Sequence, residues 1–307
     1  TLPSQGKSKA LLILISGSGW QDRNETIFGH KPFKVMADYF TRNGYAVYRY
    51  DDFPKGEFAK STTLDFADAV FLIVNFFKND KRFQDCPVGL IGHSEGGLIT
   101  FIAASQDKRI DFIISLAGVG EHISQTLLYQ MEAITRANGE LSEAEVAESV
   151  EISSHLYSIL EKSKSKEKAL KECGDYYDAY TRNMPQEVKE RIGVSTGKKI
   201  AMMQTLGSPW FYTLFHLYPK QYLKKVKCPV YALNGEKDLQ VNYISNLGGI
   251  QKYLAKNKNL KIESFPRLNH LFQECETGLP EEYGKIEQTI SPLVLERMLN
   301  WMNEIVK

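Results

Sequence analysis

The chain has 307 residues, of which 43% are hydrophobic and 24% are charged, which is the composition of a globular protein with a sizeable core. Its formal net charge of +1 gives no electrostatic basis for binding nucleic acid or an anionic membrane surface. No apolar run approaches the roughly 20 residues of a membrane-spanning helix, and four scattered cysteines do not indicate a disulfide framework.

The first 120 residues alternate between short apolar runs and amphipathic segments. An unbroken apolar run such as residues 10–15 is typical of a strand buried on both faces, as in a parallel sheet. Strands are expected at residues 10–15, 45–50, 88–91 and 111–116, helices at 32–41, 63–77 and 98–105, and a polar loop at 53–61.

Residues 121–220 break this alternation, because they are helical in pattern and highly charged. A capping box is expected at Ser142 and Glu145, and breaks between helices at residues 173–175 and 193–195. The segment is too long and too helical for a loop. It therefore predicts a helical cap inserted after a strand end, where ligand sites of α/β folds lie.

Alternation resumes after residue 220, with strands expected at 229–233 and 260–265 and helices at 243–254 and 290–306. Repeated strand-helix alternation predicts an α/β fold, with a mostly parallel sheet flanked by helices. The expected division is a core formed by residues 1–120 and 221–307, with the cap 121–220 inserted in it.

The sequence Gly92-His93-Ser94-Glu95-Gly96 lies between an apolar strand and a helical pattern. This is the G-x-S-x-G nucleophile elbow of the α/β-hydrolase fold, in which the serine occupies a sharp strand-to-helix turn. Side chains two positions on either side would collide there, which explains the glycines. Ser94 is therefore the candidate nucleophile.

A serine nucleophile needs a base and an orienting carboxylate, which follow it in this fold in the order acid, then histidine. His270 is the one histidine of six that comes in the turn after the last predicted strand. Asp238 occupies the matching turn after the preceding strand, with Glu236 as an alternative acid.

The oxyanion hole of such a site needs two N–H donors. One is expected from Glu95, which follows the nucleophile, and the other from the loop after the first strand. We place the second donor at Ser18, with Gly19 as the alternative. Substrate contacts are expected from Gly19, Trp20, Trp210 and Phe211. Of the aromatic stretch that ends the cap, Trp210 is expected to form a pocket wall and Phe215 to anchor the cap.

Several motifs together resemble the bacterial EstD-like carboxylesterases, which are related to dienelactone hydrolases and more distantly to prolyl oligopeptidases. They are GHSEGG, SGSGWQDRNE, SPWF, LNGEKDLQV, LNHLFQ and TISP. The resemblance covers nearly the whole chain. It implies an α/β-hydrolase fold, a Ser94–Asp238–His270 triad, and hydrolysis of carboxylic esters without a cofactor or a metal.

The chain departs from the pattern of that family in three places. Ser16 and Trp20 replace the His and Pro of the usual HGSGPQDR loop, and Asp51-Asp52-Phe53-Pro54 replaces Asp-Asp-Arg-Gly, which predicts an altered rim of the site. Family members commonly carry sequence before the first strand found here, so a shortened sheet is expected. The chain starts at Thr1 without a visible signal peptide, so either the bacterial cytoplasm or the periplasm is compatible with it.

The sequence thus predicts a serine esterase that acts on a small-molecule ester with a small to medium acyl or aryl group. A thioesterase or peptidase of the same fold is the alternative within the enzymes, and a non-catalytic binding module is the alternative outside them. The acyl and alcohol groups and the oligomeric state stay open.

Overall fold

The computed structural model describes residues 1–306, and its centre is a six-stranded sheet in which each neighbouring pair is parallel. The strand order is β2-β1-β3-β4-β5-β6. The strands are β1 (Leu11–Ile15), β2 (Ala46–Tyr48), β3 (Val88–His93), β4 (Phe112–Leu116), β5 (Val230–Gly235) and β6 (Leu260–Phe265). All six lie where the alternation of the sequence predicts strands.

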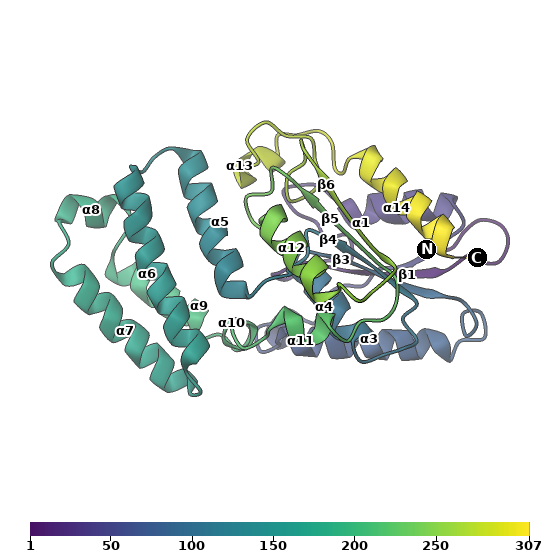
Figure 1. Cartoon of the computed structure of the whole chain (residues 1–307), viewed down its shortest axis with the longest axis horizontal. Coiled ribbons are helices and arrows are strands. Elements are labelled where there is room, and N and C mark those ends of the chain that lie inside the picture. Colours follow the sequence, from purple (N-terminus) through teal and green to yellow (C-terminus); the bar gives the residue numbers. More distant parts are fainter. Residues whose placement is uncertain (307) are drawn as a thin grey trace.

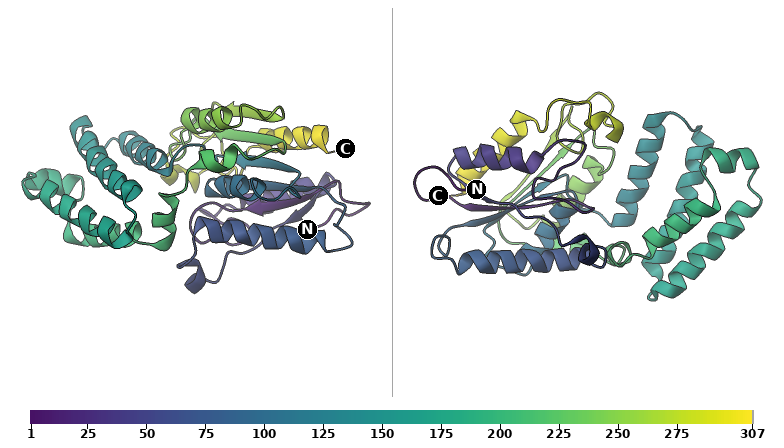
Figure 2. Two further views of the ribbon diagram at one scale, coloured as in Figure 1. Left: turned by 60° about the horizontal axis from the view of Figure 1, so that its bottom comes forward. Right: turned by 180° about the vertical axis from the view of Figure 1, so that it is seen from behind.

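Helices cover both faces of this sheet (Figures 1 and 2). Side chains of β1 alternate between the two faces, with Leu11 and Ile13 on one side and Leu12 and Leu14 on the other. The first face packs against α3 (Thr63–Lys78), α4 (Glu95–Ala104), α11 (Pro219–Leu223) and α12 (Tyr243–Tyr253). The second face packs against α1 (Pro32–Arg42) and α14 (Pro292–Ile305). Burial on both faces explains why the strands are continuously apolar.

Two short helices lie in connections of this core. The segment 53–61, expected as a polar loop, contains the single-turn helix α2 (Lys55–Phe58). The other, α13 (Pro280–Tyr283), follows the loop after β6 and buries Tyr283. Within residues 1–306, no helix is both long and apolar enough to cross a lipid bilayer.

Between β4 and β5 the chain forms a helical lobe, which we define as α5 to α10. Its helices are α5 (Ile123–Asn138), α6 (Glu143–Lys162), α7 (Lys166–Arg182), α8 (Gln186–Arg191), α9 (Thr196–Leu206) and α10 (Pro209–Leu214). In Figures 1 and 2 the lobe projects from one end of the core, and both chain termini lie at the opposite end. The capping box predicted at Ser142 and Glu145 is confirmed at the start of α6.

One predicted break in the lobe is wrong, and the other is confirmed. Helix α7 runs through residues 173–175, because Ala169, Cys173 and Tyr177 recur every four residues and bury one face of the helix. That burial outweighs the cost of about 1 kcal/mol for a glycine inside a helix. The second break is real, since Gly193 adopts φ = 75° between α8 and α9.

Candidate active site

The turn between β3 and α4 holds Ser94 in a strained conformation, with φ = 55° and ψ = −119°. A side chain at Gly92 would collide with the backbone of Gly96, and one at Gly96 would collide with the carbonyl of Ile15. Such backbone strain costs on the order of 1–3 kcal/mol and persists where surrounding structure enforces it. Ser94 is partly exposed while its neighbours in the turn are buried, so its hydroxyl is presented clear of both elements.

Asp238 and His270 meet in the loops after β5 and β6. Nδ1 of His270 lies 2.7 Å from Oδ2 of Asp238, and the exposed fractions of the two residues are 4% and 0%. The other carboxylate oxygen accepts the backbone N–H groups of Gln240 and Val241 at 2.8 and 2.9 Å. An ionised Asp238 can only accept, so Nδ1 of His270 carries the hydrogen and Nε2 is left as the basic nitrogen.

The alternative acid lies elsewhere. The carboxylate of Glu236 accepts a hydrogen bond of 2.7 Å from the Ser264 hydroxyl, and no hydrogen bond joins it to a histidine in the part of the chain that the structure describes. The structure therefore brings together Asp238 and His270 and keeps Glu236 apart from them.

A second buried pair, formed by Glu25 and His93, contacts the backbone of His270. The sequence analysis did not predict this pair. Nδ1 of His93 lies 3.0 Å from Oε1 of Glu25, and Nε2 of His93 lies 3.0 Å from the carbonyl oxygen of His270. Burial lowers the pKa of His93, but the charge and hydrogen bond of Glu25 outweigh it, so this pKa is raised. The buried carboxylate of Glu25 also accepts the N–H of Gly17 at 2.8 Å, and so links His270, the elbow and the loop after β1.

The loop after β1 contains Ser18 and Gly19, the two residues considered for the second oxyanion donor. Gly17 donates its N–H to Glu25, whereas the N–H groups of Ser18 and Gly19 have no partner in the described residues 1–306. Glu95 is the first residue of α4, where an N–H has no partner within the helix. Ser18, Ser94 and Glu95 line one cavity, and no hydrogen bond within the described residues occupies the N–H of Ser18 or Glu95.

The side chain of Glu95 joins three parts of the molecule. It is buried and accepts hydrogen bonds from the hydroxyls of Thr63 and Ser18 and from the indole N–H of Trp210, at 2.7, 2.8 and 2.8 Å. Burial without a cationic partner raises the pKa of this carboxyl. Through Glu95, the loop after β1, helix α3 and the lobe are tied together beside Ser94. The sequence reasoning considered only its backbone.

Ser94 and His270 both line a cavity of about 280 Å³ between the strand ends and the lobe. Its other walls are mostly apolar, with Leu98, Val119, Ile123, Leu127, Trp210 and Leu214 among them. An apolar cavity with a few converging polar groups is the usual form of a small-molecule site.

The other predicted substrate contacts lie away from this cavity. Phe211 is buried inside the hydrophobic core that joins the lobe to helices of the core, with an exposed fraction of 7%. Phe215, expected as an anchor of the cap and not as a substrate contact, lies in the same core with an exposed fraction of 0%. Trp20 is 42% exposed, and its indole donates to the carbonyl of Phe53 at 3.1 Å. Gly19 borders a neighbouring pocket instead. Within the described residues, no group of three or more His, Cys, Asp or Glu side chains is arranged to hold a metal ion.

Comparison with known families places the chain among hydrolases. The dienelactone hydrolase family matches residues 143–306, which is more than half of the chain. The chain belongs to the dienelactone hydrolase family. A second family, described as the C-terminal domain of BAAT and acyl-CoA thioester hydrolases, matches residues 66–173.

The chain is similar to esterase EstD of Thermotoga maritima, with 26% identity over 309 residues. The alignment covers 98% of this chain and 64% of EstD, so the chain spans somewhat less than two thirds of that relative. The resemblance inferred from the motifs is thereby confirmed.

Solved structures with low sequence identity share the fold. Est1E from Butyrivibrio proteoclasticus, solved with ferulic acid bound, superposes with a TM-score of 0.53 at 16% identity, covering 100% of this chain and 93% of Est1E. Dienelactone hydrolase from Anabaena variabilis gives a TM-score of 0.52 at 13% identity, covering 100% and 90% of the two chains. These similarities confirm the predicted α/β-hydrolase fold.

Proposed function

We propose that the protein is a serine hydrolase that cleaves carboxylic esters of small molecules through an acyl-enzyme intermediate. The observation that carries this proposal is the buried 2.7 Å pair of Asp238 and His270 in the same cavity as the strained Ser94. Similarity to an esterase and membership of the dienelactone hydrolase family support the same reaction class.

In the first half of the proposed reaction, the Ser94 hydroxyl attacks the ester carbonyl. Nε2 of His270 takes the hydroxyl proton and then gives it to the departing alcohol. Asp238 keeps His270 in the tautomer with a free Nε2 and stabilises the imidazolium that forms. The N–H groups of Glu95 and Ser18 hold the negative charge that develops on the carbonyl oxygen.

In the second half, a water molecule takes the place of the alcohol. His270 removes a proton from the water, which attacks the acyl group on Ser94. When the bond to Ser94 breaks and the acid leaves, His270 returns that proton to the Ser94 oxygen. Because His270 acts as a base in both halves, it must be neutral at the start of each. No cofactor or metal is part of this scheme.

Residues 121–220 act in this proposal as a cap that closes one side of the cavity. Trp210 is the wall residue, since it lines the cavity together with Leu214 from the lobe. The hydrogen bond from Trp210 to Glu95 supports a fixed position of that wall over Ser94.

The proposal is tested with a fluorophosphonate probe and p-nitrophenyl esters. We expect covalent labelling at Ser94 and loss of hydrolysis in Ser94→Ala by on the order of 10⁴-fold or more, without loss of thermal stability. A Ser94→Ala protein that retains a tenth of the wild-type activity would show that the nucleophile lies elsewhere. Absence of labelling and hydrolysis in the folded wild-type protein would favour a binding module.

A second candidate is a thioester hydrolase, because residues 66–173 match the acyl-CoA thioester hydrolase family. Acyl transfer from an ester or a thioester uses the same nucleophile, base and oxyanion hole. Comparing kcat/KM for an alkyl ester and a thioester with the same acyl group separates the two. An oxygen ester preferred over its matched thioester supports the first proposal, and the reverse supports the second.

A further inference from the structure

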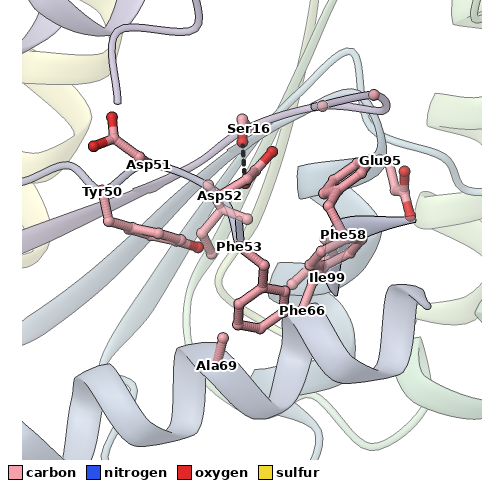
Figure 3. Close-up of a pocket in the computed structure, with 13 residues that line it drawn as sticks. Ser16, Tyr50, Asp51, Asp52, Phe53, Phe58, Phe66, Ala69, Glu95 and Ile99 are labelled. Atoms are coloured by element: carbon pink, nitrogen blue, oxygen red, sulfur yellow. Dashed lines mark hydrogen bonds between the residues drawn. The ribbon is translucent and has the colours of Figure 1, made fainter. Parts of the chain in front are cut away.

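The loop after β1 is attached to the rest of the core at both of its ends. At one end, Gly17 donates its N–H to the carboxylate of Glu25 at 2.8 Å. At the other end, Gln21 donates its N–H to the carboxylate of Asp52 at 2.8 Å, and this carboxylate is labelled in Figure 3. Residues 18–20, between these two points, are exposed. Their position therefore depends on contacts of their own.

Ser18 is held by a single carboxyl group. Within residues 1–306 its one hydrogen bond runs from its hydroxyl to Oε2 of Glu95, at 2.8 Å. A Cβ added to the next residue, Gly19, would have no atom of another segment within 4 Å, so the backbone is not packed there. The carboxyl of Glu95 is thus the contact that determines where the N–H of Ser18 lies.

Glu95 is in turn fixed from two other sides. Its Oε1 accepts the hydroxyl of Thr63 at 2.7 Å and the indole N–H of Trp210 at 2.8 Å, and the residue is 5% exposed. Burial raises the pKa of this carboxyl. An indole only donates, so Oε1 accepts in either protonation state, while Oε2 accepts from the Ser18 hydroxyl when ionised and donates to it when protonated. The connection to Ser18 therefore does not depend on the charge of Glu95.

Both N–H groups of the proposed oxyanion hole depend on this one residue. The first is the backbone N–H of Glu95 at the start of α4, and the second is the N–H of Ser18 in the same cavity as Ser94. A donor acts only if it is held about 3 Å from the developing oxyanion, and loss of one donor lowers kcat by roughly 10²–10³-fold. An unattached loop would present its N–H to that oxygen only part of the time.

We propose that Glu95 is a positioning residue for the oxyanion hole. Its backbone supplies one donor, and its carboxyl holds Ser18 so that the second donor faces the same oxygen. The inference rests on the proposed ester hydrolysis at Ser94. It assigns a role to a side chain that takes no part in the proton transfers of that reaction.

The test compares binding of two ketones of equal chain length, 1,1,1-trifluoroheptan-2-one and heptan-2-one. The oxygen of Ser94 adds to the carbonyl carbon of the trifluoroketone, His270 takes the serine proton, and the carbonyl oxygen becomes an oxyanion. Heptan-2-one forms this adduct far less readily, so its Ki measures the fit of the chain to the cavity. In Ser18→Ala, which keeps the backbone N–H, the Ki of the trifluoroketone should rise about tenfold and that of heptan-2-one should stay. For p-nitrophenyl butanoate, kcat should fall about as much with KM unchanged.

Variants of Glu95 test whether it acts through Ser18. Glu95→Ala should lower the ratio of the two affinities at least as much as Ser18→Ala, and the double variant should be little worse, because both changes break one connection. In Glu95→Gln the amide oxygen can accept from Trp210 and the amide N–H can donate to the Ser18 oxygen, so the ratio should stay within about threefold of the wild type. Ser18→Ala, at an exposed position, still tests the inference if Glu95→Ala does not fold.

Ser16→Ala is the matched control, because it removes a hydroxyl from the same loop that donates to Asp52 at 3.4 Å and not to Glu95. It should leave the affinity ratio unchanged. The same ratio as the wild type in a folded Ser18→Ala protein overturns the inference. A Glu95→Gln protein as impaired as Glu95→Ala also overturns it, because the charge of Glu95 and not its connection to Ser18 would then matter.

Melting temperatures separate positioning from stability. A purely structural role would lower the melting temperature of Ser18→Ala or Glu95→Ala and leave the affinity ratio unchanged. Failure of this inference leaves fluorophosphonate labelling of Ser94 and ester hydrolysis by the wild-type protein intact. Failure of the proposed function removes both, so the two failures are distinguishable.

Discussion

The two sides of the catalytic cavity are built differently. On the sheet side, Asp238 and His270 are buried, and each polar atom of the Asp238 carboxylate has a partner. On the lobe side, a few side-chain bonds reach the core: Trp210 to Glu95 at 2.8 Å, Tyr129 to the carbonyl of Asp238 at 3.2 Å, and Gln130 to Gln240 at 3.4 Å.

In the proposed mechanism, this difference separates the residues that carry out the proton transfers from those that select the substrate. Groups that must hold a reacting atom in place are fixed by the sheet, whose strands are buried on both faces and paired with neighbours. Groups that shape the space for a substrate come from the lobe, where replacement of a side chain changes the cavity without disturbing the proton transfers. Substitutions on the sheet side should therefore lower kcat, and those on the lobe side should change substrate preference.

The largest effect is expected from Asp238→Asn. An amide in place of the carboxylate favours the tautomer of His270 with hydrogen on Nε2, which cannot accept the serine proton, so kcat should fall by on the order of 10⁴-fold. Circular dichroism should show a folded protein. Glu236→Gln is the control and should keep nearly full activity; a crippled Glu236→Gln beside an active Asp238→Asn would reassign the acid.

Glu25→Gln tests the hydrogen-bonded pair of Glu25 and His93, which contacts the backbone of His270. The raised pKa of His93 means that this histidine contributes stability at low pH, and that the contribution is lost as pH rises through its folded-state pKa. The variant should thus be destabilised by roughly 2 kcal/mol at pH 5 and by less at pH 9. Urea unfolding at the two pH values measures this, and an equal loss of stability at both would contradict the raised pKa of His93.

Trp210 provides the test on the lobe side. Trp210→Ala should enlarge the cavity and shift preference among p-nitrophenyl esters toward bulkier acyl groups by about tenfold, since one methylene in an apolar pocket is worth roughly 1–3 kcal/mol. Trp210→Phe keeps a ring but loses the N–H to Glu95, so it should lower the melting temperature and change preference little. Phe215→Leu should affect stability alone. An unchanged acyl preference in Trp210→Ala would mean that this residue only anchors the lobe.

The smallest effect concerns Asp52, in the loop after β2. Its pKa of about 6 lies above the usual value of about 3.9, so the stability that its protonation contributes is present below pH 4 and is lost as pH rises through 6. Asparagine does not ionise, so Asp52→Asn should not lose this stability as the pH rises. Its melting temperature should exceed that of the wild type by a few degrees at pH 8 and match it at pH 4; the same difference at both pH values would contradict the raised pKa.

The sheet, and the meeting of Ser94, Asp238 and His270 at one edge of it, could be predicted from the sequence because each depends on local patterns. Apolar runs give the strands, the glycines around Ser94 give the elbow, and the parallel strand ends place Asp238 and His270 at one edge. The link through Glu25 and His93 could not be predicted, because it joins residues 68 apart whose neighbours carry no periodic signal. The polar run around Glu25, after the glycine loop, was the one available hint.

The lobe was predictable as a helical insertion but not in its contacts. Phe211 and Trp210 are adjacent in sequence, yet the helical turn of α10 directs one into the core and the other to the cavity. Aromatic content alone does not distinguish these two directions. The same holds for Trp20, whose place in a glycine loop suggested substrate contact, while its indole holds the segment around Phe53.

The pairing of β4 with β5 has a consequence for how the chain reaches its native state. Ile113 pairs with Val230, so the sheet cannot be completed until the entire lobe has been made and its two ends have come together. Loop-closure entropy rises slowly with length, by about 0.6 kcal/mol for each doubling. A lobe that has already formed its helices shortens the effective loop. Folding of the lobe first would therefore speed closure of the sheet, and a lobe variant that folds slowly would leave the edge of β4 unpaired during synthesis.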